Sequence, residues 1–322
     1  MKMKKLVSIV LCLTLMLALA ACGGSASATK MTMGTGGTSG TYYAFGGVLG
    51  QYIKNNAGID VTVVSTDGSK ANIESIDAGD YQLGTVQSDV MAYAWAGSRS
   101  FESNGAVDSF RVVAGLYAES VQLVTMDPEI KSVKDLAGKS VSIGAPGSGV
   151  SFNAVDVLAA AGMTEADIKP QYQSFADSAD ALKDGKIDAA FIVAGAPTAA
   201  ITELCTTNNA YLVPIDGEIA DNLFAASPFY TAYTIPAGTY AGQDADVTTV
   251  TVKATLIVTA SAAEEDVYNL TKAIFENVDA IAAENGKGAE LSIENATSGM
   301  TAPFHAGAAK YFAEKGVTVE TK

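Results

Sequence analysis

The feature that most constrains the fold of this 322-residue chain is a strand–loop–helix unit that occurs twice. In the first copy, a glycine-rich loop at 34–40 follows a short predicted strand at 30–34 and precedes a helix with apolar residues at i, i+3, i+4 and i+7. In the second copy, a similar loop at 144–149 separates a strand at 140–144 from a helix at 150–161. Strands that alternate with helices predict an α/β fold with a parallel sheet covered on both faces, here in two lobes.

In the first copy, a short helix at 72–78 ends at a glycine and is followed by another strand at 81–86. In the second copy, the corresponding helix lies at 178–184 and the strand at 187–193. The first copy has a further strand at 61–65. Two strand-like segments at 110–117 and 120–126 lie between the copies, and a third at 248–259 follows the second. These crossings predict a two-stranded hinge. We predict lobe 1 over 30–118, lobe 2 over 119–254, and a return to lobe 1 over 255–322.

After the last crossing, Ser261 and Glu264 have the spacing of a capping box that opens a long helix, with apolar residues on one stripe as far as 281.

The N-terminus has the pattern of a secretory signal peptide. Three lysines precede an apolar run at 6–21 that is too short to span a bilayer comfortably. The run ends in Leu-Ala-Ala followed by Cys22, which resembles the bacterial lipobox. We therefore predict that residues 1–21 are removed and that Cys22 carries lipid on the outer face of the cytoplasmic membrane, with 22–29 as a flexible tether. An ordinary cleavage site, with Cys22 incidental, is the alternative.

Charge and the scarcity of catalytic side chains argue against several functions. The formal net charge of −15 disfavours nucleic-acid binding. Once Cys12 leaves with the signal and Cys22 carries lipid, Cys205 is alone, which leaves no disulfide and no cysteine metal site. For His305, the single histidine, we favour a structural or capping role over that of a general base. We predict no metal, no cofactor and no catalysis; a hydrolase around Ser148 would lack an evident base.

The two glycine-rich loops are the predicted binding loops. In parallel α/β sheets ligands lie beyond the carboxyl ends of the strands, and each loop leads there to a helix N-terminus, which attracts anions. Glycine allows the backbone to approach a ligand and to adopt positive φ. We expect a small carboxylate to be held by the N–H groups of 37–41 and 147–151, because neither loop contains arginine. Neither loop matches a dinucleotide fingerprint or a P-loop.

Other candidate residues follow strands at the same edge. Asp89 either accepts a ligand ammonium group or caps the next helix, and we favour the cap. Tyr42 opens the first helix and could flank the pocket. The predicted ligand-binding residues are Thr35, Gly37, Thr38, Ser39, Gly40, Thr41, Tyr42, Ser69, Asn72, Gln87 and Asp89 in lobe 1, and Gly147, Ser148, Gly149, Ser151 and Gly195 in lobe 2.

Five ordered motifs between about Met31 and Gly316 resemble the TAXI family, the solute-binding subunits of TRAP-type secondary transporters. They are Thr35-Gly36-Gly37-Thr38-Ser39-Gly40-Thr41-Tyr42-Tyr43, Val86-Gln87-Ser88-Asp89, Gly144-Ala145-Pro146-Gly147-Ser148-Gly149, Ile235-Pro236-Ala237-Gly238-Thr239-Tyr240-Ala241-Gly242-Gln243 and Phe304-His305-Ala306-Gly307-Ala308. The chain departs from the family at Val150, where threonine is usual, and at Ala306, where proline is usual.

The resemblance implies a two-lobed type II periplasmic-binding-protein fold that closes about a hinge. It also implies delivery of glutamate, a related amino acid or a dicarboxylate such as 2-oxoglutarate to a fused membrane permease driven by an ion gradient. A ligand-sensing lipoprotein that feeds a receptor kinase is the alternative that the sequence leaves open.

Overall fold

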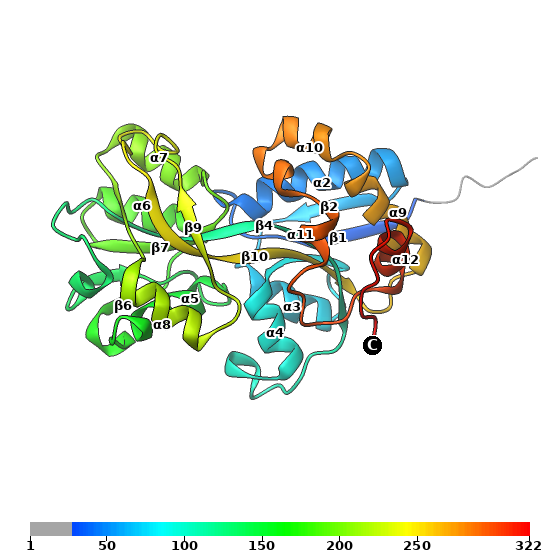
Figure 1. Ribbon diagram of the computed structural model, residues 1–322, viewed down its shortest axis with the longest axis horizontal. Coiled ribbons are helices and arrows are strands. Elements are labelled where there is room, and N and C mark those ends of the chain that lie inside the picture. Colours follow the sequence, from blue (N-terminus) through cyan, green and yellow to red (C-terminus); the bar gives the residue numbers. More distant parts are fainter. Residues whose placement is uncertain (1–27) are drawn as a thin grey trace, which may run out of the picture.

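A single ten-stranded sheet runs through both halves of the protein (Figure 1). The computed structural model describes residues 28–322, so the predicted signal peptide at 1–21, the lipidation site Cys22 and most of the tether lie outside the described residues. The strand order is β2-β1-β3-β10-β4-β7-β5-β6, with β8 paired to β4 and β9 paired to β10. Among residues 28–322, no helix is both long enough and apolar enough to cross a membrane.

The first strand–helix unit forms one end of the sheet. Its strands are β1 (Lys30–Gly34), β2 (Asp60–Val64) and β3 (Leu83–Gln87), and β1 pairs in parallel with both others. Its helices are α2 (Thr41–Ala57), α3 (Ser69–Asp77) and α4 (Ser88–Ala96), followed by the 3₁₀ turn η1 (Arg99–Phe101). Helix α2 buries the predicted apolar stripe, including Phe45, Leu49 and Ile53, and ends at Gly58 with φ of 70°.

The second unit has the same strand order at the other end. Strand β5 (Ser140–Ser142) pairs in parallel with β6 (Lys169–Gln171) and β7 (Ala189–Ala194). Its helices are α5 (Val150–Ala160), α6 (Phe175–Lys183), α7 (Ala199–Thr207) and α8 (Gly217–Ala226), with turns η2 (Val133–Leu136) and η3 (Glu165–Asp167) and strand β8 (Tyr211–Val213). The order β6-β5-β7 repeats β2-β1-β3, as expected of two copies of one framework.

Two long strands join the units: β4 (Phe110–Thr125) and β10 (Val247–Thr259), the second of which also pairs with β9 (Thr231–Ile235). Figure 1 shows both crossing from one half to the other. The prediction of two separate strands at 110–117 and 120–126 is wrong, because Ala118 and Glu119 stay extended and pair with Lys253 and Val252 of β10. The sheet is also mixed, since β4 and β10 run antiparallel to β7 and β3.

The chain ends in a group of helices: α9 (Glu264–Phe275), α10 (Val278–Glu284), η4 (Gly286–Glu290), α11 (Ile293–Thr297) and α12 (Ala306–Glu314). The predicted capping box is wrong, since α9 is capped by Ala263 and begins at Glu264. The predicted long helix is interrupted at Asn277, which caps α10. The capping role predicted for His305 is confirmed, because its Nδ1 accepts the Gly307 N–H at the start of α12.

Separate hydrophobic cores lie on the two sides of the crossing. One core draws on residues 31–117 and 254–312 and packs Phe45, Tyr117 and Phe312. Two smaller clusters, around Phe191 and Ile192 on opposite faces of β7, lie on the other side. We call the first side lobe 1 and the second side lobe 2. A ligand that reaches β4 and β10 at the crossing therefore contacts both lobes.

Candidate functional site

A pocket lies between the lobes, at the carboxyl ends of the parallel strands. Segments from both strand–helix units form its walls. The residues that line it are Gly36, Gly37, Gly40, Thr41, Tyr42, Thr66, Asp67, Gly68, Ser69, Gln87 and Glu119 from lobe 1 and the crossing, and Ala145, Ser148, Gly149, Val150, Ser174, Phe175, Val193 and Ala194 from lobe 2.

Four helices begin at this pocket without a side-chain cap. The N-cap residues of α2, α3, α4 and α5 are Gly40, Gly68, Gln87 and Gly149, and each lines the pocket. The first-turn N–H groups of a helix have no partner within the helix, and the dipole places partial positive charge at the same point. The arrangement therefore favours an anionic group in the pocket.

The side chains of the pocket do not supply positive charge. Among residues 28–322, no lysine or arginine lines it, whereas the acidic Asp67 and Glu119 do. Asp67 is exposed at the rim, but Glu119 is only 1% exposed. Any attraction for an anion must therefore come from backbone dipoles and from neutral donors such as the hydroxyl groups of Tyr42 and Ser148.

Several polar atoms in the pocket wall are buried and make no hydrogen bond within the described residues. They are Tyr42 Oη, Gln87 Oε1, Glu119 Oε1 and Ser148 Oγ. Buried polar groups in proteins are nearly always paired, because an unpaired group loses its hydrogen bonds to water. Four such atoms around one pocket indicate a site prepared for a polar ligand.

The buried carboxyls near the pocket have strongly raised pKa values. Burial raises the pKa of Glu119 to about 8, and the neighbouring Asp89 adds to the rise, while Tyr42, Gln87 and Lys287 oppose it. Burial likewise raises the pKa of Asp89 to about 7, against hydrogen bonds from the backbone and from Asn153. Burial disfavours the charged form of a carboxyl, so both groups titrate near neutral pH.

A chain of hydrogen bonds joins Gln87 of lobe 1 to lobe 2. Tyr230 Oη donates to Asp156 over 3.0 Å and accepts from Asn153 Nδ2 over 2.8 Å. The same nitrogen donates to Asp89 Oδ2 over 2.9 Å, so Asn153 Oδ1 is left to accept from Gln87 Nε2 over 3.0 Å. This chain orients the Gln87 amide with its oxygen free beside Gly149.

The lobes also touch through their backbones around the pocket. Gly147 O accepts the N–H groups of Lys70 and Ala71 at the start of α3, over 3.1 and 3.2 Å. Ser39 O accepts from Ala200 N over 3.2 Å. At the edge of the cleft, Arg99 of lobe 1 forms a two-pronged ion pair with Asp156 of lobe 2, with a shortest N–O distance of 2.7 Å. These contacts describe a closed arrangement of the two lobes.

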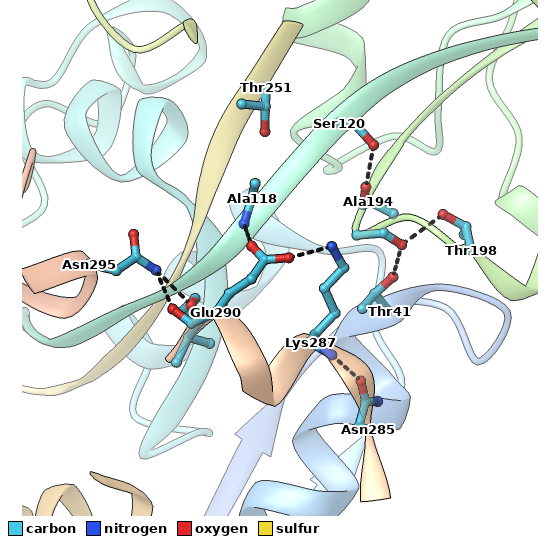
Figure 2. Close-up of polar contacts among 12 residues, drawn as sticks. Thr41, Ala118, Ser120, Ala194, Thr198, Thr251, Asn285, Lys287, Glu290 and Asn295 are labelled. Carbon is cyan, nitrogen blue, oxygen red and sulfur yellow. Dashed lines mark hydrogen bonds and ion pairs between the residues drawn. The ribbon is translucent and has the colours of Figure 1, made fainter. Parts of the chain in front are cut away.

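Lys287 and Glu290 of η4 lie where the two lobes meet (Figure 2). Lys287 Nζ pairs with Glu290 Oε1 at 2.6 Å, and Glu290 Oε2 accepts from the N–H of Ala118 on β4 over 2.7 Å. Nearby, Thr41 Oγ1 donates to Gly195 O over 2.8 Å (Figure 2). Through Glu290, η4 of lobe 1 is therefore bound to the crossing strand β4.

The structure brings half of the predicted site residues to the pocket wall. Those that line it are Gly37, Gly40, Thr41, Tyr42, Ser69, Gln87, Ser148 and Gly149. The other eight do not line it: Thr35, Thr38, Ser39, Asn72, Asp89, Gly147, Ser151 and Gly195. A ligand-binding role for the eight residues that line the pocket stays a prediction. The eight that do not line it lie elsewhere in the structure, as described next for Asn72 and Asp89.

Among the residues outside the wall, Asn72 is buried and donates to the carbonyl oxygens of Thr35 and Thr85, which ties α3 to the sheet. The cap favoured for Asp89 is wrong: the N-cap of α4 is Gln87, two residues earlier, and Asp89 lies buried in the first turn.

The glycines of the first loop also differ from expectation. Within that loop no glycine has positive φ, whereas Gly144 and Gly147 of the second have φ of 90° and 84°. Gly34 is needed for close approach instead, because a β-carbon there would collide with Asn72 and Tyr81. At Gly37 a β-carbon would meet no atom within 4 Å, so this glycine faces open space.

Glu119 and Phe175 are the main pocket residues that the sequence patterns did not identify. Glu119 interrupts the apolar run of β4, and an acidic residue in a strand that crosses between the lobes is a signal that the sequence offers. Phe175 begins α6 and lies against Gly40 across the cleft, with ring carbons 3.4 Å from where a β-carbon at 40 would lie. No local pattern distinguishes such an aromatic residue from one in the core.

A hydrolase around Ser148 would need a base that bonds its hydroxyl, and within residues 28–322 Ser148 Oγ makes no hydrogen bond. The single histidine, His305, caps α12, where Nδ1 accepts from Gly307 and Nε2 contacts Ala262 O at 3.1 Å. In the part of the chain that the structure describes, no group of three or more His, Cys, Asp and Glu side chains could hold a metal ion.

Comparisons with known proteins agree with this architecture. A sequence profile described as the NMT1-like family matches residues 33–316. A protein from Bordetella bronchiseptica RB50 is 18% identical, with a TM-score of 0.55 over 88% of this chain and 89% of that one. The alkanesulfonate-binding protein SsuA from Xanthomonas axonopodis pv. citri, bound to MOPS, is 17% identical, with a TM-score of 0.51 over 90% and 92%.

A putative L-cystine ABC transporter from Listeria monocytogenes is 18% identical, with a TM-score of 0.51 over 82% of this chain and 98% of that one. At these identities the likeness shows the fold alone. The predicted α/β fold of the periplasmic-binding-protein type is thereby confirmed.

Proposed function

The chain belongs to the NMT1-like family, and on that premise we propose that it is an extracytoplasmic receptor that captures a small carboxylate-bearing solute and passes it to a membrane transporter. The observation that carries the proposal is the pocket between the lobes, where four helices begin without a side-chain cap. Gly147 O already accepts the N–H groups at the start of α3, and the Asp89 carboxyl accepts those at the start of α4. A carboxylate placed there would therefore accept from the N–H groups of α2 and α5 and lie at the positive ends of their helix dipoles. In this role the protein binds and releases its solute unchanged.

The positions of the motifs support a TAXI-type receptor that serves a fused TRAP permease. Three of the five motifs meet at the pocket: the loop before α2, the turn before α4 and the loop before α5. The other two motifs, around Tyr240 and His305, make hydrogen bonds within the protein that stabilise the fold. Tyr240 accepts from the Thr198 N–H over 2.9 Å and donates to Gln122, while His305 caps α12.

Closure about β4 and β10 would trap the solute. The ion pair of Arg99 with Asp156 and the hydrogen bonds to Gly147 O join the lobes around the pocket. A solute that touches both lobes adds to these contacts only in the closed form, and therefore shifts the population toward it. We expect the permease to recognise that form.

Anchoring completes the proposal. Lipid on Cys22 would hold the receptor at the outer face of the cytoplasmic membrane, and residues 22–29 would connect the lipid to β1. The high negative charge of the chain makes direct adhesion to an anionic bilayer unfavourable, so the anchor is what keeps the receptor beside its permease.

Thermal unfolding with a panel of small carboxylates and amino acids tests the proposal. A ligand at 100 times its Kd stabilises the folded state by about 2.7 kcal/mol, which raises the melting temperature by several degrees. Co-purified ligand, detected by mass spectrometry of the denatured protein, is the supporting observation. If no member of the panel changes the melting temperature and no small molecule co-purifies, the proposal is wrong.

A further inference from the structure

Glu119 is a buried carboxyl in the wall of the pocket. It lies on β4 opposite Val252 of β10, where the lobes are joined, and is 1% exposed. Its Oε1 makes no hydrogen bond within residues 28–322. A carboxylate in such a place is unfavourable unless something pairs with it. The unpaired Oε1 of Glu119 is therefore an acceptor that a group from outside the chain could satisfy.

Tyr42 and Gln87 oppose the rise in the Glu119 pKa through hydrogen bonding, but the surrounding side chains of the described residues do not pair Glu119 with a positive charge. Tyr42 from α2, Asp89 from α4, Tyr117 from β4 and Lys287 from η4 all face this region. Lys287 is the one cation among them, and it forms its ion pair with Glu290 instead (Figure 2). Asp89 is a second buried carboxyl, which makes the region more electronegative.

A second acceptor lies beside Glu119 in the same wall. Gln87 Oε1 is without a hydrogen bond within the described residues, and the chain of bonds through Asn153 directs the Gln87 amide nitrogen away toward lobe 2. Two buried acceptor oxygens together suit a group with several N–H donors and a positive charge, which describes an ammonium group.

Within residues 28–322, the lobe 2 side of the wall has no charged side chain. Val150, Phe175, Val193 and Ala194 lie there beside the hydroxyl groups of Ser148 and Ser174. Among the described residues the wall has no basic side chain that could neutralise a second ligand carboxylate. The helix N-termini supply roughly half a charge each and can accommodate one carboxylate without further help.

From these contacts we propose that the solute is a zwitterionic α-amino acid with an uncharged, largely apolar side chain, and that Glu119 and Gln87 receive its ammonium group. Its carboxylate lies at the N-termini of α2 and α5, and its side chain lies against Phe175 and Val193. This inference rests on the proposed function and narrows it, because it disfavours dicarboxylates and glutamate.

Isothermal titration of the purified mature protein with matched ligands tests the inference. Leucine and its 2-oxo acid differ in the ammonium group, and leucine and glutamate differ in side-chain charge. We expect leucine or valine to bind at least tenfold more tightly than the 2-oxo acid, than 2-oxoglutarate and than glutamate. Glu119→Gln should weaken amino-acid binding at least tenfold and remove most of the preference for the amine. Glu129→Gln, at an exposed site in lobe 2, should change nothing.

Tighter binding of 2-oxoglutarate, of glutamate or of the 2-oxo acid than of leucine would overturn the inference and leave the proposed function standing. Retention of the amine preference by Glu119→Gln would also overturn it. Failure of every carboxylate to bind would remove the proposed function and the inference together. Should Glu119→Gln not fold, the comparison of leucine with its 2-oxo acid on the unaltered protein still decides.

Discussion

The backbone of Gly149 lies directly against the side-chain oxygen of Gln87, across the boundary between the lobes. A β-carbon at position 149 would overlap Gln87 Oε1 and would come within 3.1 Å of Val90 Cγ2. Gly149 has φ of −74°, so it is not needed for an unusual backbone conformation. Glycine is required here because the lobes approach each other closely at the start of α5.

Replacing Gly149 with valine should weaken, at least tenfold, the binding of the carboxylate or amino acid that raises the melting temperature of the protein. The side chain would hold the lobes apart and would displace Gln87, while the α5 backbone conformation is one that valine can adopt. Titration calorimetry measures the affinity, and small-angle scattering should show a more open protein. Gly47→Val is the matched control, since that glycine is exposed on α2 with no atom within 4 Å of the added carbon. Equal loss in both variants would contradict the steric explanation.

Replacing Arg99 with methionine should weaken ligand binding about two- to fivefold, because its ion pair with Asp156 holds the closed form but does not touch the pocket. Partly exposed ion pairs contribute on the order of 0.5–1 kcal/mol. Arg111→Met is the control: Arg111 lies over Trp95 and donates to carbonyl oxygens within lobe 1, so affinity should not change. A hundredfold loss on changing Arg99 would mean that an arginine, not the helix dipoles, binds the anion.

The ligand-free protein should lose stability as the pH rises from about 5 to 8. In the folded state Glu119 has a pKa of about 8, raised by burial, so below pH 8 it holds a proton that the unfolded chain releases above about 4.5. Because the folded state binds more protons in this window, the free energy of unfolding falls with rising pH. Asp89, with a pKa of about 7, acts in the same direction.

Urea unfolding at several pH values measures this fall. In Glu119→Gln the fall in the free energy of unfolding should be smaller, and at pH 8 the variant should be at least as stable as the unaltered protein. The difference between the two proteins is the decisive quantity. His305, whose pKa burial lowers, changes stability in the opposite direction but equally in both. Parallel curves would show that Glu119 does not titrate in this range.

Affinity for leucine should increase as the pH rises from 6.5 to 8, because Glu119 must lose its proton to receive an ammonium group and its pKa is raised to about 8. Binding should therefore release protons, which titration calorimetry detects as a dependence of the heat on the ionisation enthalpy of the buffer. If affinity fell over this range, a protonated Glu119 would be donating to an anion instead.

Replacing Cys22 with alanine should release most of the protein from the membrane fraction and abolish incorporation of labelled fatty acid. The anchor is the expected source of attachment, so binding of ligand to the released protein should be unchanged. Immunoblots of fractionated cells measure the distribution. Continued membrane attachment of the variant would favour an ordinary signal peptide and some other means of attachment.

Much of the local structure was predictable from sequence. The strand predicted at 30–34 is confirmed, and the apolar stripe of α2 and the helix predicted at 150–161, which ends one residue earlier, follow from their spacing. The errors arose where tertiary contacts override local preference. The crossing strand β4 continues through Ala118 and Glu119 because β10 pairs with it there, and Asp89 packs against Asn153 instead of capping α4.

The sequence by itself determined that glycine-rich loops precede helices at two equivalent places, and hence that uncapped N–H groups would be available to an anion. This follows from short-range spacing and backbone chemistry. Only the tertiary structure decided what else surrounds that anion. Glu119, Gln87 and Gly149 belong to three separate segments, and their meeting depends on strand register at the crossing and on closure of the lobes. Burial, which raises the pKa of Glu119, is likewise a property of the assembled fold.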